Sequence, residues 1–191
     1  MATPTNLPAA FTAGQVLTAA QLNDLRGAFR VLQVKSTTKT DTYTDSSASG
    51  TLTSVTGLSV AITPQSATSK ILVYATFNYG ANGGNRAIFA FTGGNTATAY
   101  IGDAAGSRRR VATGAQSIDA NDVVPVTMLY LDSPATTSAI TYAVQAADIA
   151  GGTLYINRSS TDTNGTNLSL IHISEPTRQA EISYAVFCLK K

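Results

Sequence analysis

The chain has 191 residues, and only 13% of them are charged, against roughly 25% in an average globular protein. Thirteen Lys and Arg against eleven Asp and Glu give a formal net charge of +2, which excludes the clear basic excess of a typical nucleic-acid binder. No apolar run approaches the roughly 18 residues of a membrane span. The N-terminus lacks the basic start and apolar core of a signal peptide, so we expect synthesis in a cytosol.

Residues 1–30 are predicted to form an N-terminal arm that serves attachment or oligomerisation. Within it, residues 18–29 are predicted to form one short helix, because Thr18 and Gln21 fit a capping box. Three apolar residues recur on one face of this helix: Leu22, Leu25 and Phe29. Two interpretations stay open, a helix that leans on its own domain and a connector that docks onto a larger assembly.

Residues 31–167 are predicted to form one β-domain, truncated at its C-terminal end. Short stretches rich in β-branched and aromatic residues predict strands at 31–35, 41–44, 58–63, 70–79, 86–92, 96–101, 123–132, 140–147 and 153–157. Gly93 to Asn95 is expected to make a tight hairpin turn, and Pro125 indicates an edge strand or a bulge. Many short strands with little helix indicate an all-β fold, an antiparallel β-sandwich resembling a jelly roll, with a barrel as the alternative.

Residues 168–191 resemble a translated sequencing adapter rather than part of a natural protein. Residues 169–178 and 182–191 match two segments of a transposon-type adapter in frame, and the gap between them has the length of a sample index. Setting this segment aside removes His172 and Cys188, the only histidine and cysteine of the chain. The alternating stretch Ser183–Cys188 would then join a sheet only opportunistically.

Few residues of the chain are suited to catalysis. Without a native histidine or cysteine, Ser–His and Cys–His nucleophiles and the usual zinc sites are excluded. The acidic residues before position 168 are nine aspartates: Asp24, Asp41, Asp45, Asp103, Asp119, Asp122, Asp132, Asp148 and Asp162. Nearly all fall at predicted turns, where we expect them to accept backbone hydrogen bonds. Asp162 to Gly165 resembles the opening of a calcium loop, with a solvated turn as the simpler interpretation. We predict no catalytic residue, cofactor or metal.

The only run of consecutive like-charged residues considered as a site is formed by Arg108, Arg109 and Arg110. They are candidates for an anion or ligand contact together with Tyr100 and Asp103, and the alternative is a solvated loop tip between two strands. Four tyrosines could also stack on sugar rings, although strand tyrosines more often pack in a core: Tyr43, Tyr79, Tyr100 and Tyr155.

Five segments carry a resemblance to known proteins: residues 7–29, 55–73, 101–114, 131–145 and 151–164. Through them the chain resembles a broad group of tailed-bacteriophage virion proteins, the tail-fibre or minor structural proteins. The resemblance implies a β-sandwich virion component that forms a homotrimer, faces the host and has no catalytic residues. It also implies other phage tail proteins and a host surface glycan as partners.

We therefore predict a non-enzymatic phage structural protein, made in the host cytoplasm and carried in the virion, with no nucleic acid bound and no membrane insertion. A capsid decoration protein is not distinguished from a tail fibre by these residues. The first alternative is a carbohydrate-binding module or adhesin of the same fold. The second is a glycan depolymerase, which needs two carboxylates about 5–10 Å apart.

Overall fold

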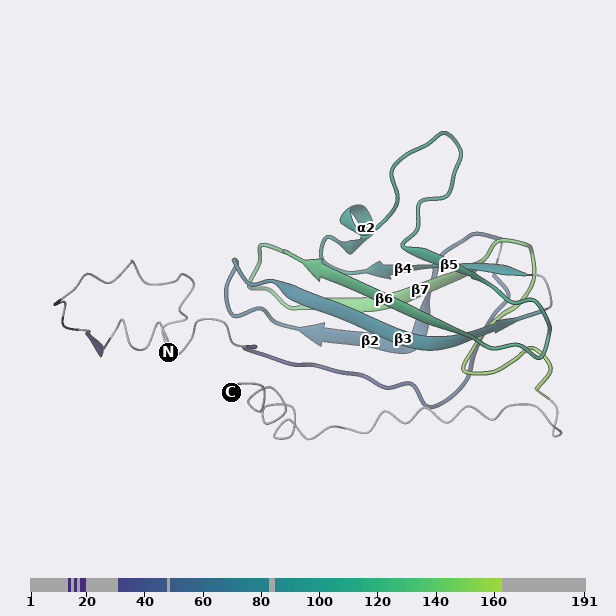
Figure 1. Cartoon of the computed structure of the whole chain (residues 1–191), viewed down its shortest axis with the longest axis horizontal. Helices are drawn as coiled ribbons and strands as arrows, with labels where there is room; N and C mark the ends of the chain where they lie inside the picture. Colours follow the sequence, from purple (N-terminus) through teal and green to yellow (C-terminus); the bar gives the residue numbers. More distant parts are fainter. Residues whose placement is uncertain are drawn as a thin grey trace.

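The computed structural model describes residues 31–47, 49–82 and 85–162, together with residues 14, 16, 18 and 19. Two four-stranded antiparallel sheets pack face to face in a sandwich, which confirms the all-β prediction (Figure 1). The strands are β1 Tyr43–Asp45, β2 Thr53–Ile62, β3 Ile71–Ala81, β4 Arg86–Thr92, β5 Thr113–Gln116, β6 Val124–Asp132, β7 Ile140–Asp148 and β8 Leu154–Ile156. One helical turn, α2, covers Thr96–Ala99.

The strand order is that of a jelly roll. The first sheet has the order β1-β8-β3-β6 and the second sheet has the order β2-β7-β4-β5. Most consecutive strands therefore lie in opposite sheets, and the last strands of the chain pair with the first ones. This pairing of eight strands is the double Greek key of the jelly-roll architecture. It places β1 and β2 along one long edge of the sandwich and β6 and β5 along the other.

The core between the sheets is built from the inward residues of alternating strands. Phe77 and Tyr79 of β3 pack edge-on against Phe89 of β4, with ring centroids 5.1 and 5.5 Å apart. Val126 and Met128 of β6 are buried beside them. Burial of each large apolar side chain contributes about 1.5–3 kcal/mol, so these rings hold the two sheets together.

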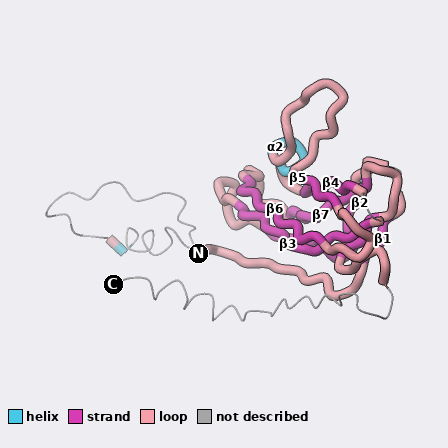
Figure 2. Tube along the Cα trace, turned by 45° about the vertical axis from the view of Figure 1, so that its right-hand side comes forward, coloured by secondary structure: helices cyan, strands magenta, loops and turns pink. Residues whose placement is uncertain are grey.

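Two predicted strands are wrong. Residues 31–35 belong to no strand and lie in an extended segment that runs along one long side of the sandwich (Figure 2). Residues 96–101 begin with α2, because the Thr96 hydroxyl donates to the Gly93 carbonyl at 2.6 Å and the backbone turns. Gly93 and Gly94 both have positive φ, 101° and 54°, but they lead into this turn rather than into a hairpin.

Other predictions are confirmed, and some concern residues outside the described part of the chain. β4 has the predicted bounds, and β6 is an edge strand, as Pro125 indicated. The strand β5 was missed, because Thr-Gly-Ala-Gln carries little of the usual β-strand composition. The predicted helix at 18–29 falls almost wholly outside the described residues, and the segment 168–191 does so entirely.

Candidate functional site

The three arginines lie on the connection between α2 and β5, residues 100–112, which projects beyond the sheets (Figure 1). Arg109 donates through Nη1 to the carbonyl of Gly50 at 2.9 Å and through Nη2 to that of Ser49 at 3.4 Å. Arg110 donates through Nε to the Gly102 carbonyl at 2.7 Å. Two guanidinium groups therefore hold the loop in place. Within the described chain, the guanidinium of Arg108 has no hydrogen-bond partner.

Tyr100 and Asp103 do not form one site with the arginines. Tyr100 is half-buried and stacks between Phe91 and Tyr130, with centroids 5.7 and 5.0 Å apart. Its hydroxyl accepts a hydrogen bond from the backbone N–H of Leu129 at 3.4 Å, on the outer edge of β6. Tyr100 therefore closes the gap between the sheets, and of these two residues only Asp103 lies exposed on the arginine loop.

The other predicted sugar-stacking tyrosines are also engaged in packing. Tyr79 is completely buried, and its hydroxyl donates to the Asn85 carbonyl at 3.2 Å. Burial is the main cause that raises the pKa of this phenol, and the charge of Asp148 is the second. The guanidinium of Arg158 lies over the ring of Tyr155 at 4.6 Å, and Tyr43 packs against the core. Tyr74, which is not among these predicted tyrosines, is 60% exposed.

The turn aspartates accept backbone hydrogen bonds, as predicted. Asp45, Asp119 and Asp148 each accept from the N–H two residues later, in every case at 2.8 Å. This is the hydrogen bond of an Asx turn. These three carboxylates therefore shape the connections after β1, before β6 and after β7.

Two further aspartates have structural partners. Asp132 is completely buried and accepts from the Tyr142 hydroxyl at 2.6 Å and from the Asn95 N–H at 3.2 Å. Burial, and next the hydrogen bond to Asp132, raise the pKa of Tyr142. Asp162 pairs with Arg158 at 3.4 Å, while the rest of the predicted calcium loop lies outside the described residues. No cluster of three or more potential metal ligands occurs in the part of the chain that the structure describes.

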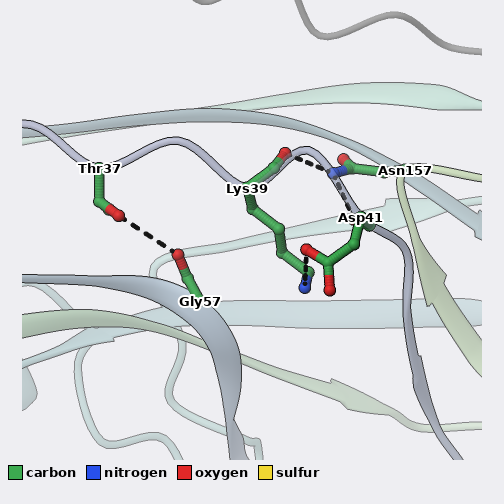
Figure 3. A network of polar contacts seen from close by, with 5 residues as sticks. All are labelled: Thr37, Lys39, Asp41, Gly57 and Asn157. Atoms are coloured by element: carbon green, nitrogen blue, oxygen red, sulfur yellow. Dashed lines mark hydrogen bonds and ion pairs between the residues drawn. The ribbon is translucent and has the colours of Figure 1, made fainter.

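Five residues join the extended segment before β1, residues 31–42, to the sandwich (Figure 3). We call this segment the arm; it follows residues 1–30, the predicted N-terminal arm. Asn157 follows β8 and donates through Nδ2 to the carbonyls of Lys39 and Asp41, at 3.1 and 3.2 Å. The ammonium of Lys39 donates to Asp41 at 2.9 Å, and this hydrogen bond lowers the pKa of the Asp41 carboxyl. The Thr37 hydroxyl reaches the Gly57 carbonyl at 3.5 Å. We call these five residues the arm clamp.

The backbone of the arm clamp is specialised for this contact. Gly57 has a φ of 87° inside a register irregularity of β2, and a Cβ added there would lie 3.6 Å from the Lys39 ammonium. Asn157 also has a positive φ, 66°, which asparagine tolerates better than most residues. The side chain of Lys39 is only 3% exposed. The arm therefore leaves the domain at one fixed point.

The outer face of β3 and β6 is the second notable surface. Four large apolar side chains project from it: Leu72 63%, Tyr74 60%, Leu129 52% and Leu131 51% exposed. Leu72 is the cross-strand partner of Leu131, and Tyr74 that of Leu129. The next pair is Thr76 and Thr127, whose hydroxyls lie 3.3 Å apart. We call the four apolar residues the sheet patch.

Two apolar runs in the sequence are a signal for the sheet patch. A strand with one wet face alternates apolar and polar residues. Here Ile71 to Tyr74 and Met128 to Leu131 are uninterrupted apolar runs, although β6 is an edge strand. Such runs indicate that both faces of the strands meet apolar surroundings.

Comparison with known proteins leaves the family unassigned. No protein-family model matches the chain, and no curated protein matches it. No helix among the described residues is long and apolar enough to cross a membrane. The predicted kinship with tailed-phage virion proteins therefore stays a prediction.

Proposed function

We propose that this chain is a non-enzymatic structural protein of a tailed-phage particle, a tail fibre or tail-associated protein displayed through its N-terminal arm. The observation that carries the proposal is the arm clamp, which joins residues 37–41 to the sandwich through hydrogen bonds. A fixed joint suits a domain that must be held in a defined position on a larger assembly. Jelly rolls recur in viral capsid and lectin domains, although a fold alone does not define a function.

The described aspartates favour a structural role over the depolymerase alternative. Asp45, Asp132 and Asp148 are buried and accept hydrogen bonds from the protein itself. Asp41 and Asp162 pair with basic side chains. A glycoside hydrolase needs two carboxylates that face a substrate, one of them protonated. Asp119 and Asp122 accept hydrogen bonds from the backbone of their own turn, at 2.8 and 2.9 Å. Among the described aspartates, Asp103 alone is exposed and without a hydrogen-bond partner.

Proteomics of purified particles tests this proposal. Phage particles from the sample that supplied the gene are banded by density, and peptides from residues 31–162 are quantified in each fraction. We expect these peptides to co-band with major tail proteins and to separate from host cytosolic proteins, which are the control. Peptides found only in the unassembled fraction would overturn the virion assignment.

A long sequencing read through the same locus provides a second test. We expect the reading frame to depart from the present sequence near Leu168 and the neighbouring genes to encode tail proteins. A frame that continues through residue 191 would restore His172 and Cys188 as native residues. The catalytic prediction would then have to be reopened.

The projecting arginine loop supports a second candidate function, host-glycan binding. The Arg108 and Asp103 side chains are exposed and have no hydrogen-bond partner among the described residues. On a glycan array we expect binding to acidic glycans that Arg108→Ala removes. Lys70→Ala is the matched control, since Lys70 is an exposed cation elsewhere on the surface. Absence of wild-type binding across the array would reject this candidate.

A further inference from the structure

The large apolar side chains on the described surface fall into two groups and two isolated residues. The first group is the sheet patch on β3 and β6. The second lies on the arm before the clamp: Val31 78%, Leu32 39% and Val34 53% exposed. We call these three residues the arm patch. Only Val16 and Ile118 lie outside the two groups in this part of the chain.

The two patches lie on different sides of the molecule. The arm clamp holds residues 37–41 beside β2 and the end of β8, on the edge formed by β1 and β2. The sheet patch includes β6, which forms the opposite edge of the first sheet. From the clamp the arm continues along its own side of the sandwich (Figures 1 and 2). In this arrangement neither patch covers the other within one chain.

We propose that the arm patch of one copy packs onto the sheet patch of a second copy. The inference rests on the proposed structural role and names the surfaces through which the chain would assemble. Each patch lacks an apolar cover, and the other patch can provide one. Removing both apolar areas from water would stabilise the association. Large exposed apolar patches on soluble proteins commonly mark interaction sites.

The charge distribution favours a second copy of this chain as the partner that covers the sheet patch. Residues 31–34 read Val-Leu-Gln-Val, and the outward residues of β3 and β6 from Leu72 to Thr76 and from Thr127 to Leu131 are all uncharged. The formal net charge of the whole chain is only +2, so repulsion between copies is weak. A glycan would find few hydrogen-bonding groups on the sheet patch, and a basic or acidic partner would find no opposite charge there.

The contact would form through side chains rather than by addition of a strand. Pro125 lacks an N–H on the free edge of β6, and the Tyr100 hydroxyl already accepts from the Leu129 N–H there. Stable interfaces bury about 800 Å² on each partner. Neither the three side chains of the arm patch nor the four of the sheet patch provide that much area. The interface therefore extends over neighbouring residues, or the association is weak and concentration-dependent.

The two surfaces can meet in two ways. Two copies that exchange arms reciprocally close into a dimer, whereas one-way contacts close into rings or continue into filaments. The arm clamp reduces the ordering cost of binding, because it presents the arm in a fixed direction. Since patch-to-patch packing also gives a dimer, mixing variants that each lack one surface provides the decisive test.

Sedimentation velocity of the full 191-residue chain measures the assembly. The variants are a sheet variant, Leu72→Ser with Leu129→Ser, and an arm variant, Val31→Ser with Val34→Ser. Ile118→Ser is the control, since Ile118 is an isolated residue 84% exposed. We expect concentration-dependent oligomers for the wild type and the control, and monomers for both variants. Near-UV circular dichroism verifies folding, and Leu129→Gln replaces the sheet variant if that variant unfolds.

Mixing the two variants shows which surface packs onto the sheet patch. The sheet variant keeps an intact arm and the arm variant keeps an intact sheet patch, so the mixture should form a 1:1 heterodimer and nothing larger. A monomeric wild type, or an arm variant that assembles normally, overturns the proposal. The second result would indicate sheet patch packing on sheet patch. Particle proteomics is independent of this experiment, so failure of the interface and failure of the virion assignment are distinguishable.

Discussion

The outer faces of the two sheets differ although both carry apolar side chains. On the second sheet, Ile88 and Ala90 of β4 and Ala147 of β7 point away from the core between the sheets, yet they are only 7%, 3% and 2% exposed. On the first sheet, Leu72 and Leu129 are more than half exposed. The chain itself shields these central side chains of the second sheet, whereas it leaves the apolar side chains of the first sheet open. An apolar outward residue therefore does not by itself reveal whether its cover is internal or a partner.

The arginine loop is part of this difference. Residues 93–112 form a long connection between β4 and β5, and Arg109 ties it to Gly50. The N–H of Gly50 in turn donates to the carbonyl of Asp148 at the end of β7, at 2.6 Å. Contacts to the second sheet thus hold the loop. Two of the three consecutive arginines, Arg109 and Arg110, therefore stabilise the structure through hydrogen bonds.

The largest expected effect compares one apolar residue from each outer face. Ile88→Ala should lower the free energy of unfolding by about 2–5 kcal/mol, because it removes buried methyl groups and leaves a cavity. Leu129→Ala should change it by no more than about 0.5 kcal/mol, as is usual on a surface. Urea unfolding, at a concentration where the wild type is monomeric, measures both. Equal losses would show that the two outer faces are equivalent in stability.

Loss of the arm clamp should have the next largest effect. Asn157→Ala removes two hydrogen bonds to the arm and places alanine at a positive φ, so we expect a loss of about 1–3 kcal/mol. Hydrogen exchange at residues 37–41 should accelerate more than exchange in β4.

Asn157→Gly is the matched control for the clamp. It keeps the permitted backbone conformation and removes only the side-chain donor. It should therefore release the arm with a smaller loss of stability than Asn157→Ala. Unchanged exchange of the arm in both variants would contradict the clamp.

A pH-dependent contribution should come from Asp45, which connects the two sheets. Burial alone would raise the pKa of Asp45, but hydrogen bonds from Ser47 and from the Thr53 hydroxyl outweigh it and hold the pKa below 3.8. The carboxylate therefore stabilises the fold above about pH 4, and this stabilisation disappears as the pH falls through the lowered pKa.

Asp45→Asn tests that contribution. The variant should be less stable than the wild type at neutral pH, and the difference should shrink progressively below about pH 4. Urea unfolding at a series of pH values measures this. Asp103→Asn is the control, because Asp103 is exposed on the arginine loop. A difference that stays constant over the whole series would contradict the charge-dependent role.

The smallest effect is expected for Arg109→Ala. Its donor groups are exposed, so the loss of stability should be no more than about 1 kcal/mol. Exchange in the loop should nevertheless accelerate, and the loop should become more sensitive to trypsin at Arg108 and Arg110. Arg108→Ala should leave exchange in the loop unchanged. If both variants behave alike, Arg109 does not tie the loop to Gly50.

Strand composition predicted most of the sandwich, because strong strands carry their own signal. β4 has the predicted bounds, and β3 and β6 differ from theirs by no more than two residues, since β-branched and aromatic residues fill them. β5 was missed because only its pairing with β4 makes Thr-Gly-Ala-Gln a strand. The turn at Thr96 depends on the Gly93 carbonyl and, through Asn95, on the distant Asp132, which no local pattern reveals.

The candidate site was less predictable, because its parts are distant in sequence. The exposure of the arginines was foreseen, but the acceptors of Arg109 lie about sixty positions earlier. A buried Lys39 contradicts the usual exposure of lysine, and its partner Asn157 is 118 positions away. The sheet patch could have been inferred from the apolar runs alone. The arm patch was predicted as a strand, but residues 31–35 pair with none of the strands that the structure describes.

The arm clamp also constrains how this protein can vary among its relatives. Gly57 and Asn157 both have a positive φ, a backbone conformation that glycine and asparagine tolerate better than most residues. A relative without the asparagine at 157 has lost the donor to the carbonyls of Lys39 and Asp41, and with it the contact that holds a buried lysine at 39. In an alignment of diverse relatives positions 39, 57 and 157 should change together, while the arm residues before them diverge with whatever surface they bind.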